Sequence, residues 1–137
     1  MKIDTRDIFE QIGNAFYAVA TDQHIAPLEV AELKMLIAKD WLPRRTSNET
    51  VVSDEAHCIL ITIDSLLAAE VTSSQAFREF AAFFRLHPDV FSTELKQRML
   101  DTANEIATTF RHDGTVVNQR LDDMRALLQL PEEISRP

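Results

Sequence analysis

The sequence predicts an all-α fold, on three observations. Apolar residues recur at every third or fourth position along most of the chain, which is the period of an amphipathic helix. Only two glycines occur in 137 residues, too few for turn-rich β architectures. No segment alternates apolar and polar residues between turn signals, as half-buried strands do. We therefore expect one domain over residues 1–137, a bundle of about six helices with an ordered core of about 5–130.

The first two predicted helices are bounded by capping residues and prolines. Asp4 or Thr5 can cap the first helix, which should end near Thr21. Pro27 suits the first turn of the second helix, because its missing N–H would be unpaired there in any case, and Pro43 ends that helix. The apolar stripe of the second helix is Val30, Leu33, Ile37 and Trp41.

The third helix, over residues 54–70, is apolar on most sides, so we expect it to be central and buried. It follows the polar segment 44–53, which is the predicted loop. Thr72 and Gln75 have the spacing of a capping box and open the fourth helix. The dipeptide His87-Pro88 ends it.

The last two helices are also delimited by local signals. Ser92 caps the fifth helix, and Asp113-Gly114 breaks it. The sixth helix ends at Pro131. These short connections favour neighbouring helices that pack against one another in a bundle.

Charge and apolar runs limit the classes of function. Fourteen Lys and Arg residues against twenty-two Asp and Glu give a net charge of −8, whereas nucleic-acid binders are usually basic. The charged N-terminus lacks the apolar run of a signal peptide, and the longest apolar run, 58–63, is too short to span a bilayer. We therefore expect a cytoplasmic protein that binds no nucleic acid and has no membrane span.

The first and last thirds of the chain share a pattern. A shift of 91 residues places Asp22 on Asp113 and Leu36 on Leu127. Each copy has an apolar helix, then Asp, two further residues, a β-branched apolar residue and a second apolar helix. The pattern predicts two related helix–turn–helix units.

These two copies resemble the tellurite-resistance TerB-like family over most of the chain. That family has an Ala-rich helix, Asp-Gly, an aliphatic residue two positions later, and Glu at the seventh position after the Asp. The first copy, AFYAVATDQHIAPLEVAELKML, places Asp22, Ile25 and Glu29 on this motif. The second copy, ANEIATTFRHDGTVVNQRLDDMRALL, places Asp113, Gly114 and Val116 on it. Gln23 replaces the expected Gly, and Arg120 replaces the expected second Glu.

The resemblance implies an all-helical module with an acidic site that binds a divalent cation or a partner protein in stress response. Asp22, Glu29 and Asp113 are then the metal ligands, and their oxygen atoms suit Ca²⁺ or Mg²⁺. The same three residues also fit purely structural roles. An Asp after a helix bonds to the backbone of its own turn, and a Glu in the first helical turn faces unpaired N–H groups.

Enzymatic chemistry has no support in the sequence, because no acid–base pair or nucleophile motif stands at a defined spacing. The spacing of the histidines and Cys58 does not predict zinc, and neither Asp turn is an EF-hand. The alternative to a cation module is therefore a protein-interaction or homodimerisation scaffold without metal. Phe77 and Phe83 could extend from the core into such a partner surface.

Overall fold

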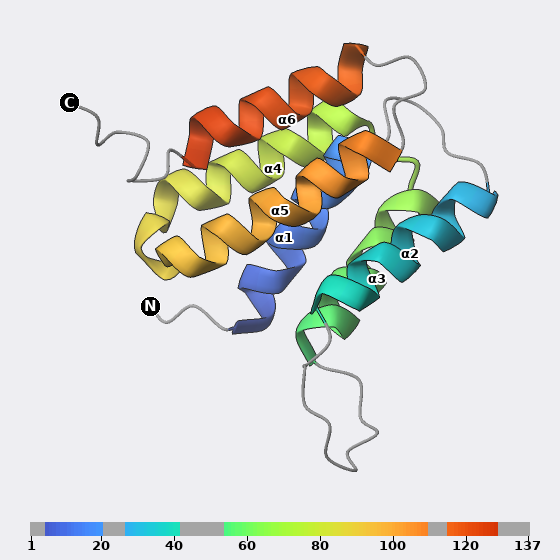
Figure 1. Ribbon diagram of the computed structural model, residues 1–137. Coiled ribbons are helices and arrows are strands. Elements are labelled where there is room, and N and C mark those ends of the chain that lie inside the picture. The colour runs from blue at the N-terminus through green and yellow to red at the C-terminus, as the bar shows by residue number, and fades with distance from the viewer. Residues whose placement is uncertain (1–4, 21–26, 42–53, 110–114, 129–137) are drawn as a thin grey trace.

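The computed structural model describes residues 5–20, 27–41, 54–109 and 115–128, and it confirms an all-helical bundle (Figure 1). No strand occurs among these residues. The elements are α1 (Thr5–Ala20), α2 (Pro27–Trp41), α3 (Asp54–Ala68), α4 (Ser73–Leu86), a short 3₁₀ helix η1 (Pro88–Val90), α5 (Thr93–Thr109) and α6 (Thr115–Leu128). None of the described helices is long and apolar enough to cross a membrane.

The central helix is α1, so the prediction that the third helix would be central is wrong. α1 packs against α3, α4, α5 and α6 (Figure 1). Every residue from Ile12 to Ala20 is buried. By contrast, α3 buries one stripe, formed by Ala56, Ile59 and Ile63, while its Ile61 is 49 % exposed.

Small side chains explain why α1 is central. Gly13 lies so close to α3 that a Cβ built on it would be 2.9 Å from Thr62 Cβ and 3.2 Å from the Ile59 carbonyl oxygen. Ala15, Ala18 and Ala20 are buried on the same helix. These small side chains let neighbouring helices approach the α1 backbone closely.

The predicted caps of α4 and α5 are confirmed. Gln75 N donates a hydrogen bond to Thr72 Oγ1 at 3.1 Å, and Leu95 N donates to Ser92 Oγ at 3.1 Å. Between α3 and α4, Glu70 takes the left-handed conformation with φ 56°. Backbone bonds from Glu70 N and Val71 N to the last turn of α3 close this turn as a Schellman motif.

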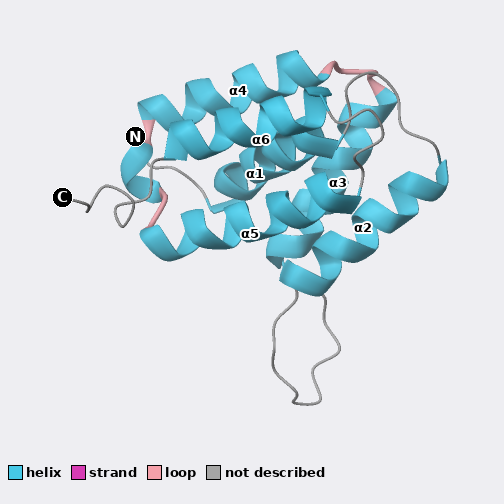
Figure 2. Cartoon of the chain, turned by 45° about the horizontal axis from the view of Figure 1, so that its top comes forward, coloured by secondary structure: helices cyan, strands magenta, loops and turns pink. Residues whose placement is uncertain are grey.

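The helix at the edge of the bundle is α2, which packs chiefly against α3 and α5 (Figure 2). Leu33, Ile37 and Trp41 face the core and are fully or almost fully buried, whereas Val30 is half-buried. An ion pair of 2.7 Å between Lys34 Nζ and Asp64 Oδ1 ties α2 to α3. The opposite side of α2 faces away from the bundle in both views (Figures 1 and 2).

Candidate functional site

Two of the three predicted metal ligands, Asp22 and Asp113, lie outside the described residues. The third, Glu29, is a half-buried residue in the first turn of α2, where the helix dipole favours a carboxylate. Within the described part of the chain, no group of three His, Cys, Asp or Glu residues is placed to hold a metal ion. The cation site of the inter-helix turns therefore stays a prediction.

Arg120, which stands where the family motif has a Glu, joins three helices. Its Nε donates to Ser73 Oγ at 3.0 Å, and its Nη1 forms an ion pair with Asp123 Oδ2 at 3.0 Å. Ser73 is buried and donates in turn to the Ala18 carbonyl oxygen at 2.8 Å. This chain of bonds links α6 to the start of α4 and the end of α1. The departure from the motif thus has a structural role that sequence reasoning missed.

A polar network joins α2 to α5. Trp41 Nε1 donates to Thr102 Oγ1 at 3.0 Å, and Thr102 Oγ1 donates to Asp40 Oδ2 at 2.9 Å. Lys39 Nζ lies 3.6 Å from Asp40 Oδ1 and 3.6 Å from Glu105 Oε2. The side chains come from the last turn of α2 and from one turn of α5, so the network fixes this end of α2 against α5.

Two carboxyl groups, those of Asp40 and Glu105, meet within this network. A hydrogen bond to Asp40, together with burial and the Asp40 charge, raises the pKa of Glu105, although Lys39 opposes the shift. Glu105 Oε1 is buried, and no donor among the described residues reaches it. The protonated form of Glu105 is therefore more favourable here than in a solvated Glu side chain.

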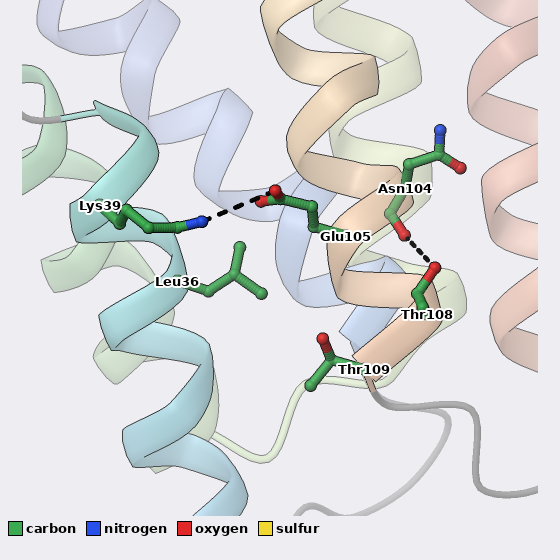
Figure 3. A pocket seen from close by; sticks show the side chains of 6 residues that line it. All are labelled: Leu36, Lys39, Asn104, Glu105, Thr108 and Thr109. Carbon is green, nitrogen blue, oxygen red and sulfur yellow. Dashed lines mark hydrogen bonds and ion pairs between the residues drawn. The ribbon is translucent and has the colours of Figure 1, made fainter.

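A cavity of about 340 Å³ opens beside this network. Its lining comes from α2 and α5 (Figure 3): Leu36, Lys39, Asn104, Glu105, Thr108 and Thr109. The Thr108 hydroxyl donates to the Asn104 carbonyl oxygen of its own helix at 2.9 Å. The lining thus combines the apolar side chain of Leu36 with charged and polar side chains, a mixture that suits binding of a side chain.

The side of α2 that faces away from the core carries an apolar stripe beside two charged residues. We define the outer face of α2 as Leu28, Ala31, Met35 and Ala38, of which the first three are exposed and Ala38 is half-buried. Leu28 is 78 % exposed and Met35 is 71 % exposed. The spacing of three, four and three residues aligns the four side chains along one stripe. A surface helix of a monomer normally presents polar residues there.

The flank of this outer face that borders α5 carries two opposite charges. Glu32 follows Ala31 and is exposed, and Lys39 follows Ala38 with 64 % of its side chain exposed. The two residues are seven positions apart, so they point to the same side of the helix. The acidic residue lies toward the N-terminal end of α2 and the basic residue toward the C-terminal end.

Other residues considered in the sequence lie in structural positions. Phe77 and Phe83 are half-buried and pack against the core, where Phe83 contacts the rings of Phe91 and His87. Cys58 is half-buried on α3, and His57 is exposed beside it. Leu28 and Met35 on the outer face of α2 are more exposed than Phe77 and Phe83.

Comparison of the chain with protein-family models, curated proteins and solved structures finds no match. The TerB-like resemblance stays a prediction from the two motif copies.

Proposed function

We propose that this protein is a non-enzymatic interaction module that binds a protein partner through the outer face of α2. The observation that carries the proposal is the exposure of Leu28 and Met35, 78 % and 71 %, on a helix whose opposite side is in the core. Apolar side chains gain free energy when a partner removes them from water. Single exposed apolar residues are common, but an aligned apolar stripe on an edge helix is typical of an interface.

The cavity between α2 and α5 supports this proposal. It lies beside the outer face, and Leu36 and Lys39 contribute to its lining. A ridge of Leu and Met next to a depression can receive one helix of a partner, with an anchor side chain in the depression. Methionine is well suited to such a surface, because its flexible thioether adapts to different neighbours.

Photo-methionine, a methionine analogue with a diazirine that inserts into nearby bonds under ultraviolet light, tests the proposal. The chain has four methionines. Met99 and Met124 are completely buried and Met1 lies outside the described residues, so Met35 is the described methionine that a partner can reach. We expect a covalent protein adduct at residue 35 in cells that express the chain natively. The adduct is identified by mass spectrometry, and the complex is then rebuilt from purified components.

The matched control is Met35→Leu, which keeps the apolar face and removes the photoreactive group from it. We expect the adduct to disappear in this variant while the rebuilt complex still forms. The same adducts in both proteins would contradict the proposal. The divalent-cation and stress-response role that the family resemblance implies is a separate proposal, which depends on Asp22 and Asp113.

A further inference from the structure

We infer that the partner on the outer face of α2 is a second copy of this chain, with the two α2 helices antiparallel. The inference rests on the proposed function and adds the identity and orientation of the partner. It follows from the charges along α2, which are complementary to themselves when the helix is reversed, and from the central place of Met35 in that pairing.

The charges on the flank select the orientation. Glu32 and Lys39 lie on one side of α2, two turns apart. A two-fold axis perpendicular to the helices brings the same flanks of both copies together. In the antiparallel pair, each Glu32 therefore faces Lys39 of the second copy. In a parallel pair the two-fold axis would run along the helices and place these flanks on opposite sides of the interface, so Glu32 would not meet Lys39, and the two helix dipoles would be aligned unfavourably.

The same register places Met35 at the centre of the pair. Matching Glu32 to Lys39 of the second copy places the two-fold axis midway between these positions, close to Met35. The two Met35 side chains then meet across the axis, where flexible thioethers adapt to one another. Met35 is central in the interface, and Leu28 lies toward its edge. Central, fully covered residues contribute most to binding.

Lys39 can take part because its present ion pairs are long. Its Nζ lies 3.6 Å from both Asp40 Oδ1 and Glu105 Oε2, whereas a charge-assisted hydrogen bond is closer to about 2.8 Å. With 64 % of its side chain exposed, Lys39 can reach a third carboxylate without leaving the first two. A single 15-residue helix from each copy is a small interface, so we expect a reversible dimer in the micromolar range.

Sedimentation velocity of the purified protein across about 1 to about 500 µM tests whether this dimer forms, a range chosen for small, weak interfaces. We expect monomer at the low end and dimer at the high end. Met35→Glu should keep the protein monomeric throughout, and Glu32→Lys should weaken the dimer by placing like charges together. Leu86→Glu is the matched control. Leu86 is 74 % exposed at the end of α4, so the same change there should leave dimerisation unaltered.

Carbodiimide coupling tests the orientation in the wild-type protein, because it joins a carboxylate to an amine that it contacts. An equal mixture of ¹⁴N and ¹⁵N protein separates links between copies from links within one copy. We expect a mixed-isotope link between Glu32 and Lys39. The intramolecular link between Lys34 and Asp64, whose atoms are 2.7 Å apart, is the internal positive control.

Three results would overturn the inference. They are a monomer at every concentration, a dimer that survives Met35→Glu with an unchanged melting midpoint, and a dimer in which Lys39 couples only within its own copy. A monomer that still gives an adduct with a different protein at residue 35 would reject the second copy and keep the proposed function. Loss of both the dimer and the adduct would reject the two together.

Discussion

Replacing Thr102 by Val should destabilise the protein by about 3 kcal/mol. The hydroxyl accepts a hydrogen bond from Trp41 Nε1 at 3.0 Å and donates one to Asp40 Oδ2 at 2.9 Å. Valine has nearly the same volume, so no cavity forms and only the two bonds are lost. Trp41 is 0 % exposed and Thr102 is 1 % exposed, so water cannot replace the hydroxyl at the indole.

The magnitude follows from the two groups that lose their partner. A buried N–H without an acceptor costs about 1–3 kcal/mol, and a bond to a charged group contributes about 1.5–3 kcal/mol. The Asp40 side chain is 22 % exposed, and water recovers part of its loss, which leaves a sum near 3 kcal/mol. For a chain of this length, that corresponds to a fall of about 10 °C in the melting midpoint.

Urea unfolding followed by far-ultraviolet circular dichroism measures the change in the free energy of unfolding. Thr108→Val is the control, because Thr108 lies on the same helix but its hydroxyl is exposed and bonded to its own helix at 2.9 Å. We expect this variant to change stability by less than about 0.5 kcal/mol. Equal, small losses in the two variants would refute the view that the network secures α2 on α5.

Three further predictions concern other parts of the molecule. Glu105→Gln should gain stability relative to the wild type as the pH rises above 4.5, the ordinary pKa of Glu, and the two proteins should differ by a constant amount at lower pH. The reason is that the raised pKa of Glu105 in the folded protein stabilises it while the carboxyl is protonated, and this stability is lost as Glu105 ionises beside Asp40. Unfolding experiments from pH 3 to pH 8 measure the difference in the free energy of unfolding between the two proteins. Gly13→Ala should lower the free energy of unfolding by about 1–2 kcal/mol in urea, because the 2.9 Å contact with α3 outweighs the gain in helix propensity. In a thermal melt of metal-stripped protein, Ca²⁺ or Mg²⁺ should raise the midpoint by several degrees, and the double variant Asp22→Asn, Asp113→Asn should lose that shift.

Each of these has a clear contrary result. Parallel pH curves for Glu105→Gln and the wild type would mean that folding does not raise the pKa of Glu105. A Gly13→Ala protein as stable as the wild type would mean that α3 can move away from α1. No thermal shift with either ion at millimolar concentration would remove the cation module from consideration.

The fold was predictable from local signals because helix ends depend on neighbouring residues. Pro27 opens α2, and Thr72 and Ser92 cap α4 and α5, as their sequence context predicts. The position of each helix in the bundle was not predictable in this way. It depends on the approach of Gly13 to Thr62, two residues far apart in the sequence, and periodicity within one helix carries no information about such contacts.

The candidate site also has a part that the sequence predicts and a part that only the structure shows. The helical spacing of Leu28 and Met35 is present in the sequence. The stripe of Leu33, Ile37 and Trp41 is enough to predict α2, so nothing in the sequence draws attention to a second stripe. Only the structure shows that the two stripes lie on opposite sides of the helix and that one of them is exposed. The meeting of Asp40 with Glu105 joins two helices through 65 positions of sequence, and no motif spacing indicates it.

The central place of α1 also has a consequence for synthesis of the chain. α1 leaves the ribosome before the helices that cover it, and α3, the first of these in the sequence, begins 34 residues after Ala20. At about 5–20 residues per second, α1 waits roughly two to seven seconds for α3, and longer for α6. During that time the segment from Ile12 to Ala20, which is buried throughout in the finished protein, lacks the helices that cover it. Folding of this bundle therefore completes only after α6 has emerged.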